Sequence, residues 1–127
     1  MILLDTSSLV HFLRLKGEPS IKARVKGIIA RGDAVLCDLV AVEIWMGVAT
    51  SEDERDVRRL TTVLPCLPTD GNVWQLARAI GAQCRRAGTP VPSSDLLIAA
   101  CAFAHGAEIE AEDKHFTALC AARDALR

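Results

Sequence analysis

The chain opens with an apolar run that ends on a carboxylate, and this opening constrains the fold more than any other feature. The first four residues are apolar, Asp5 follows, and Thr6, Ser7 and Ser8 then add hydroxyl groups. A run without polar alternation is typical of a strand covered on both faces, as in a parallel sheet. Because the carboxyl ends of such strands are where open α/β folds hold ligands, Asp5 is predicted to lie at a functional edge.

Turn-forming residues divide the rest of the chain into alternating segments. Helices are predicted over residues 8–15, 19–30, 38–48, 51–64, 72–87 and 96–104, and strands over residues 34–37, 66–69 and 107–111. Ser51 and Glu54 have the spacing of a capping box, and Ser93 or Ser94 is predicted to cap the next apolar helix. The alternation predicts an α/β fold with a parallel β-sheet flanked by helices on both faces. The last strand, in which glutamates alternate with apolar residues, is predicted to be an edge strand.

Length and hydropathy restrict the class of protein. A chain of 127 residues is expected to form a single domain over residues 1–127, with no linker. Half of its residues are hydrophobic, yet charged residues interrupt every apolar run well before the roughly 18 residues of a membrane span. The N-terminus has no charged region ahead of an apolar segment and no small-residue cleavage site. A soluble, cytoplasmic protein is therefore expected.

The cysteines and the net charge argue against a disulfide framework, a zinc site and an overall attraction to nucleic acid. The five cysteines are an odd number, widely spaced, with no C-x-x-C pair, so we interpret them as core residues rather than as disulfides or zinc ligands. The histidines have no paired spacing either, which argues against zinc. A formal charge of −1 gives no overall attraction to nucleic acid. A polyanionic partner would therefore need a local basic patch or bound cations.

Four acidic residues lie where an α/β sheet would bring distant segments to one edge: Asp5, Glu43, Asp95 and Asp113. Each also has a structural explanation on its own. Asp5 and Asp95 have helix-capping positions, Glu43 can pair with a basic residue, and Asp113 can occupy a solvated turn.

Taken together, the four carboxylates favour a metal site. Two carboxylates about 5 Å apart repel by roughly 3 kcal/mol at an effective dielectric constant of 20, so four of them need protonation or a bound cation. Oxygen ligands of this kind select Mg²⁺ or Mn²⁺.

These residues resemble a known family over the whole chain. The sequence is similar to PIN-domain ribonucleases, specifically the VapC-type toxins of toxin-antitoxin pairs. The similar segments are LLDTSSLV at 3–10, VEIWMG at 42–47, SDLLIAACA at 94–102 and EDKHF at 112–116. By this resemblance, Asp5, Glu43, Asp95 and Asp113 match the acidic metal-binding and catalytic quartet, and Ser7 matches a hydroxyl that orders the site. The chain departs from the family pattern at Ala111, where threonine is frequent, and at Glu110, where an apolar residue is usual.

The resemblance implies a PIN-like α/β/α sandwich that hydrolyses RNA phosphodiester bonds with Mg²⁺ or Mn²⁺. It also implies a cognate VapB-like antitoxin protein and a homodimer. A basic rim for RNA is predicted at predicted element ends: Arg14, Lys16, Arg85, Arg86 and Lys114. The helices over residues 51–64 and 72–87 are the predicted dimer contact. A groove for an antitoxin helix is predicted on the early helices, at Phe12, Leu13, Trp45 and Met46.

Two other classes stay open at this point. Phosphatases of the haloacid dehalogenase type also begin with a strand and an aspartate nucleophile, but they need a second aspartate two residues later, where this chain has Ser7. A non-catalytic binding module, whose acids are caps and ion pairs, is the other alternative. Titration with divalent metal ions separates that module from both enzymes.

Overall fold

Four short parallel strands form the centre of the molecule. The computed structural model describes residues 1–127 and places the strands at β1 (Ile2–Leu4), β2 (Ala34–Cys37), β3 (Cys66–Leu67) and β4 (Glu108–Glu110). Their order in the sheet is β3-β2-β1-β4, and every neighbouring pair is parallel. The predicted parallel sheet is therefore confirmed, and so is the edge position of the last strand. Parallel pairing brings the carboxyl ends of β1, β2 and β4 to one edge.

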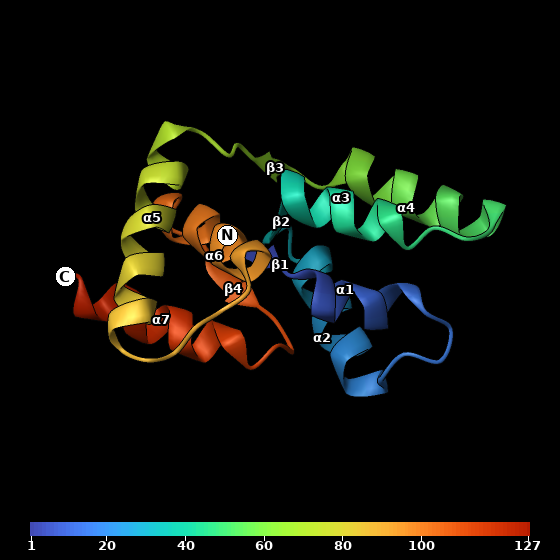
Figure 1. Ribbon diagram of the computed structural model, residues 1–127. Coiled ribbons are helices and arrows are strands. Elements are labelled where there is room, and N and C mark those ends of the chain that lie inside the picture. The colour runs from blue at the N-terminus through green and yellow to red at the C-terminus, as the bar shows by residue number, and fades with distance from the viewer.

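Helices cover the sheet on both sides, giving the expected α/β/α sandwich (Figure 1). Their bounds are α1 (Thr6–Leu13), α2 (Pro19–Ala30), α3 (Asp38–Met46), α4 (Ser51–Val63), α5 (Gly71–Arg86), α6 (Ser93–Ala104) and α7 (His115–Ala125). The three C-terminal helices pack together on one side, and α1, α2 and α4 lie on the other. Helix α3 contacts both α1 and α6. Segments from both halves of the chain therefore meet near α1, α3 and α6.

The burial of the strands explains why their sequences lack alternation. Leu3 and Leu4 are fully buried in β1, and all four residues of β2 are buried. Helices on both faces leave these strands no solvent-facing side, so an aliphatic side chain is favoured at every position. Strand β4 differs because it lies at an edge, where Glu108 is exposed. No helix in the structure is long and apolar enough to cross a membrane.

Two glycines allow the close packing on which the C-terminal half depends. A Cβ atom on Gly81 of α5 would lie 2.9 Å from a methyl group of Leu96, so this glycine lets α5 and α6 approach closely. Gly106 has a φ of +69°, a conformation that glycine adopts without steric cost, and it turns the chain from α6 into β4.

The structure differs from the sequence predictions at the N-terminal ends of three helices. The capping box of α4 is formed by Thr50 and Asp53, one residue before the predicted Ser51 and Glu54. Neither Ser93 nor Ser94 caps α6, because its N-cap residue is Pro92. Helix α1 begins at Thr6 rather than at residue 8, directly after the strand.

Helix α7 is the one element that the sequence analysis did not predict. Its buried residues Phe116, Leu119 and Ala122 recur every three positions, which is the spacing of one face of a helix. That pattern was available in the sequence, but the charged turn in front of it obscured the start of the helix.

The cysteines follow the core interpretation only in part. All five are free thiols, and Cys37, Cys84 and Cys101 are buried. Cys66 is exposed, because β3 is an edge strand, and its thiol lies 3.3 Å from the Asp38 carboxylate.

Candidate functional site

Asp5 combines the role of a helix cap with that of a candidate ligand. It ends β1 and is the N-cap of α1, and its Oδ2 accepts hydrogen bonds from the backbone N–H of Ser7 at 3.1 Å and from Ser7 Oγ at 2.6 Å. Its Oδ1 is buried and has no hydrogen-bond partner. The side chain is only 3% exposed, so this unpaired oxygen is costly unless a cation reaches it. Capping therefore occupies one carboxylate oxygen and leaves the other free.

Ser7 connects the ends of two strands. Its Oγ donates to Asp5 after β1 and accepts a hydrogen bond of 2.8 Å from the backbone N–H of Glu112 after β4. The backbone N–H of Asp5 also donates to the carbonyl of Glu110 at 2.9 Å. These bonds hold the segment that carries Asp113 against the end of β1.

The most compact group in the site is formed by Asp95, Asp113 and His115. One ligand atom from each lies within 4.8 Å of the others. His115 Nδ1 is 2.6 Å from Asp113 Oδ1 and 3.1 Å from Asp95 Oδ2. Asp95 is in the first turn of α6, Asp113 precedes α7, and His115 is the first residue of α7. The fold thus joins residues that are 20 positions apart in the sequence.

The pKa shifts of the two aspartates reflect this crowding. Burial, followed by the negative charges of Asp113 and Asp5, raises the pKa of Asp95 to about 6, and His115 opposes the change. Burial acts in the same direction on Asp113, but the backbone N–H and the ring of His115 hold the pKa of Asp113 below its ordinary value. The influence of Asp5 on Asp95 places the end of β1 beside the start of α6.

Glu43 lies at the flank of this cluster rather than within its most compact part. It projects from the middle of α3, and its Oε1 accepts a 2.7 Å hydrogen bond from Thr6 Oγ1. No basic residue pairs with it, so the ion-pair explanation for Glu43 is not observed. Thr6 and Asp5 are adjacent in the chain, which brings Glu43 to the same edge as Asp5.

The unusual Glu110 has hydrogen-bond and ion-pair partners of its own. Its carboxylate accepts a 3.0 Å hydrogen bond from the buried Ser8 and a 2.7 Å bond from Arg24 Nε on α2. Arg24 also pairs with Glu112, and these hydrogen bonds raise the pKa of its guanidinium group. The departure from the family pattern at Glu110 is therefore neutralised by Arg24.

His115 is the site residue that sequence reasoning missed. From the sequence, the histidines were set aside because they have no paired spacing, whereas the ring of His115 lies within hydrogen-bond distance of two of the four acids. Its position two residues after Asp113 was the available signal.

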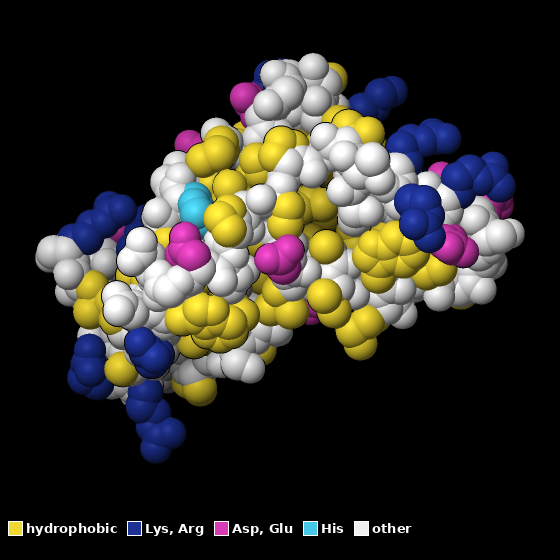
Figure 2. Space-filling view, turned by 90° about the horizontal axis from the view of Figure 1, so that it is seen from above, with side chains coloured by type: hydrophobic (Ala, Val, Ile, Leu, Met, Phe, Trp, Pro, Cys, Tyr) yellow, Lys and Arg dark blue, Asp and Glu magenta, His cyan; other side chains and the backbone are white.

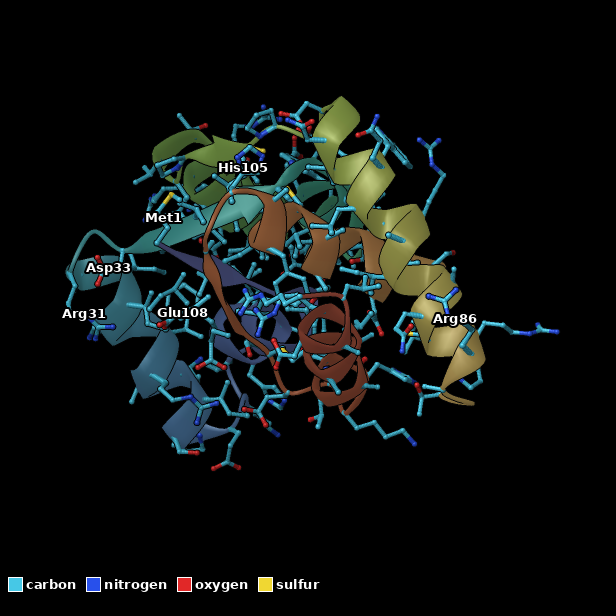
Figure 3. All side chains as sticks on the ribbon, turned by 90° about the vertical axis from the view of Figure 1, so that its left-hand side faces the viewer. Met1, Arg31, Asp33, Arg86, His105 and Glu108 are labelled. Atoms are coloured by element: carbon cyan, nitrogen blue, oxygen red, sulfur yellow. The ribbon has the colours of Figure 1, made fainter.

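The predicted basic residues are all exposed, and two of them flank the acids. Lys114 follows Asp113 directly, and Arg14 lines the same groove as Glu43. In Figure 3, Arg86 lies on the opposite side of the molecule from Met1 and Asp33, which precede β1 and β2. The amino ends of β1 and β2 are thus separated from Arg86, which belongs to the predicted basic rim.

Comparisons with known proteins agree with this geometry. The model of the PIN domain family matches residues 2–122. A VapC ribonuclease of Mycobacterium bovis, Mb1587, is 37% identical over 121 residues, which cover 91% of this chain and 89% of the relative. Ribonuclease VapC11 of Mycobacterium tuberculosis gives the same values.

Solved structures share the fold at lower identity. FitAcB from Neisseria gonorrhoeae aligns with a TM-score of 0.80 and 24% identity, covering 94% of both chains. VapBC2 from Rickettsia felis, bound to a DNA fragment from its promoter, aligns with a TM-score of 0.76 and 18% identity, covering 92% of both chains. None of these matches supports a phosphatase of the haloacid dehalogenase type.

Proposed function

This chain belongs to the PIN domain family, as a relative of the VapC ribonucleases, and from that premise we propose that it is a divalent-metal-dependent endoribonuclease and the toxin of a toxin-antitoxin pair. Asp5, Glu43, Asp95 and Asp113 are its proposed metal-binding and catalytic residues, with Ser7 in a supporting role. The metal is proposed to be Mg²⁺ or Mn²⁺, because the site offers mainly carboxylate oxygens.

The observation that carries this proposal is the unpaired Oδ1 of Asp5. This buried oxygen has no protein donor, and it lies beside two further carboxylates whose charges already repel one another. A divalent cation satisfies both conditions, because it supplies a ligand contact to the orphaned oxygen and offsets the repulsion. The donor set therefore fits the metal that the family implies.

Hydrolysis of RNA in this site requires no side-chain nucleophile. A bound divalent ion lowers the pKa of a water molecule and offsets the charge that builds on the phosphate. Asp5, Glu43, Asp95 and Asp113 would hold that ion, and Ser7 keeps the Asp5 carboxylate in one orientation. The water oxygen attacks phosphorus, the bond to one ribose oxygen breaks, and that oxygen leaves with a proton. We expect Lys114 and Arg14 to contact the flanking phosphates, because both are exposed and basic.

Incubation of the purified protein with total RNA tests this activity. Cleavage is expected with Mg²⁺ or Mn²⁺ and not in chelator, and mapping of the new ends identifies the target. Asp5→Asn is expected to abolish cleavage and to leave the fold intact. Asp33→Asn is the matched control, because Asp33 is an exposed carboxylate before β2 whose side chain pairs with Arg31. Equal cleavage by both variants would remove Asp5 from the mechanism.

Metal titration of the same variants addresses the remaining alternative. Divalent ions that bind in an Asp5-dependent way without any RNA cleavage would indicate a non-catalytic binding module. The absence of Asp5-dependent binding would contradict the proposed metal site itself.

A groove next to Glu43 supports the proposal of an antitoxin partner. It has a volume of about 310 Å³, lies between α1, α3 and α4, and is lined by Leu13, Ile44, Val48 and Glu43 among others. Of the four residues predicted for this surface, Leu13 lines the groove, whereas Phe12 and Trp45 pack partly against the core elsewhere and Met46 is 80% exposed outside it. An apolar segment of a VapB-like antitoxin is proposed to occupy the groove and to cover the acids.

Expression in a bacterial host tests the toxin role. The chain alone is expected to arrest growth, and co-expression of its cognate antitoxin is expected to restore growth. Leu13→Asp should weaken this rescue while RNA cleavage by the purified variant persists. Harmless expression of a folded, metal-loaded protein would contradict the toxin role.

A further inference from the structure

His115 offers the proposed metal site a nitrogen ligand. We propose that His115 Nδ1 coordinates the same divalent ion as Asp95 and Asp113, and that it gives the site a preference for Mn²⁺ over Mg²⁺. This inference rests on the proposed metal-dependent function and specifies the ligand set of that site.

The distances suit a shared ion. Adjacent ligands of an octahedral ion with bonds of about 2.1 Å lie about 3 Å apart. His115 Nδ1 lies 3.1 Å from Asp95 Oδ2 and 2.6 Å from Asp113 Oδ1. Nδ1 is buried and makes no well-aligned hydrogen bond to either carboxylate. An ion bound here would be held by His115 Nδ1 together with the carboxylates of Asp95 and Asp113.

The local structure holds the imidazole in this position. His115 is the first residue of α7, and its backbone N–H donates a 2.8 Å hydrogen bond to Asp113 Oδ1. The next residue, Phe116, is buried and anchors the helix in the core. The same turn therefore orders the histidine ring and the Asp113 carboxylate. An ion bound by one of these side chains would also lie within reach of the other.

The unpaired oxygen of Asp5 is an independent sign that a cation belongs here. Asp5 lies between β1 and α1, in a different part of the chain, its buried Oδ1 lacks a partner, and its charge acts on Asp95. A nitrogen donor among these oxygens changes which ion is favoured. Both ions accept carboxylate oxygens, but Mn²⁺ is a transition ion and accepts an imidazole nitrogen more readily than Mg²⁺, which retains its water, so His115 should favour Mn²⁺ over Mg²⁺.

Pulsed electron paramagnetic resonance of the Mn²⁺-loaded protein tests this ligand directly. The wild-type protein is expected to show coupling of Mn²⁺ to a ¹⁴N nucleus, and His115→Gln is expected to abolish that coupling. Calorimetry is expected to show Mn²⁺ affinity weakened about 10-fold or more by His115→Gln, with a much smaller change for Mg²⁺.

His105→Gln is the matched control. His105 caps α6 at the end opposite Asp95, ten residues or about 15 Å along the helix, and Figure 3 shows it near Met1. Its ring lies 2.8 Å from the carbonyl of Pro68, and glutamine retains a donor for that contact. This variant should keep both the ¹⁴N coupling and the Mn²⁺ affinity.

The outcomes separate this inference from the proposed function. Mn²⁺ binding that Asp5→Asn abolishes, without ¹⁴N coupling in the wild-type protein, would overturn the role of His115 and leave the metal site standing. Coupling that persists in His115→Gln would also overturn it. Mn²⁺ binding that is absent, or indifferent to Asp5→Asn, would overturn both. The wild-type spectrum decides the question even where the variant folds poorly.

Discussion

At the residue scale, Asp5 shows why one acidic residue of this site can be interpreted from the sequence either as a helix cap or as a metal ligand. Its Oδ2 caps α1 through Ser7, while its buried Oδ1 is left without a partner. One carboxylate can therefore cap a helix with one oxygen and offer the other to a metal ion. A sequence pattern typical of a helix cap does not argue against a metal-binding role. The contact of His115 with Asp95 was not predictable in the same way, because it depends on the packing of α7 against α6.

The raised pKa of Asp95 predicts how the metal-free protein responds to pH. The folded pKa of about 6 exceeds the ordinary value of 3.8, so the folded state binds this proton more tightly than the unfolded state. The stability that Asp95 contributes is thus fully present below about pH 4 and is lost as the pH rises through about 6. In chelator at about pH 8, Asp95→Asn should melt at a higher temperature than the wild type.

Thermal melting across pH in chelator measures this effect. The advantage of Asp95→Asn should shrink as the pH falls towards 4, because protonation then relieves the wild-type carboxylate. Asp33→Asn serves as the control, since its exposed side chain lies at the amino end of β2. An Asp95→Asn variant that is less stable than the wild type at about pH 8 would contradict the crowding of the acids.

Ser7→Ala is predicted to impair cleavage more than stability. The change removes the 2.6 Å hydrogen bond to Asp5 Oδ2 and leaves the N–H of Glu112 without its acceptor. We expect a loss of about 1 kcal/mol in the free energy of unfolding and a 10-fold or greater fall in the cleavage rate. Urea denaturation and single-turnover RNA cleavage measure the two effects. Ser20→Ala, an exposed serine on α2, should change neither, and normal cleavage by Ser7→Ala would remove its positioning role.

At the scale of the elements, local sequence signals located helices well and their ends less well. The parallel strands were predictable because burial on both faces leaves a continuous apolar run. Helix ends depend on which of several neighbouring polar residues bonds the backbone, and Thr50 and Ser51 are both suitable caps. Helix α7 was missed because a charged turn precedes it and obscures its start, although its buried residues have helical spacing in the sequence.

The capping box of α4 gives a prediction that separates two adjacent residues. Thr50 Oγ1 accepts a 3.0 Å hydrogen bond from the N–H of Asp53, whose carboxylate accepts one of 3.2 Å from the N–H of Thr50. Thr50→Ala should therefore lower the free energy of unfolding by about 1 kcal/mol. Ser51→Ala should have almost no effect, because Ser51 is already inside the helix. Urea denaturation of both variants checks this. A larger loss of stability in Ser51→Ala than in Thr50→Ala would instead support the capping box predicted from the sequence.

At the scale of the whole molecule, topology assembles the site from distant parts of the chain. The parallel order β3-β2-β1-β4 aligns the ends of β1 and β4, and α3 and α6 bring Glu43 and Asp95 towards them. The meeting of Asp5 and the segment that carries Asp113 was predictable, because strand ends in such a sheet lie at one edge, and the metal-binding role of the four acids stays a prediction. The position of Glu43 at the flank of the site was not predictable, because it depends on how α3 crosses between α1 and α6.

The homodimer and its contact through residues 51–64 and 72–87 stay predictions, and the surface of the molecule suggests that α3 also takes part. Figure 2 shows hydrophobic side chains in a broad band across one face, with most lysine and arginine side chains towards the two ends. The large exposed apolar residues include Val42 and Met46 on α3 and Trp74 on α5, and their side chains are 53%, 80% and 52% exposed. Helix α4 exposes mainly charged residues, with Val63 as its exposed large apolar side chain. We therefore expect α3 to join α5 in the contact.

Light scattering without antitoxin tests this assembly. The wild type at low micromolar concentration should have about twice the 13.7 kDa mass of one chain. Trp74→Glu and Met46→Glu should each shift the protein towards the monomer, because a charge buried in an apolar contact is costly. Val63→Glu tests the contact through α4, and Leu15→Glu is the control, since Leu15 is 95% exposed beyond the end of α1. A wild-type mass near 13.7 kDa would refute the dimer, whereas dissociation by Val63→Glu alone would return the contact to α4.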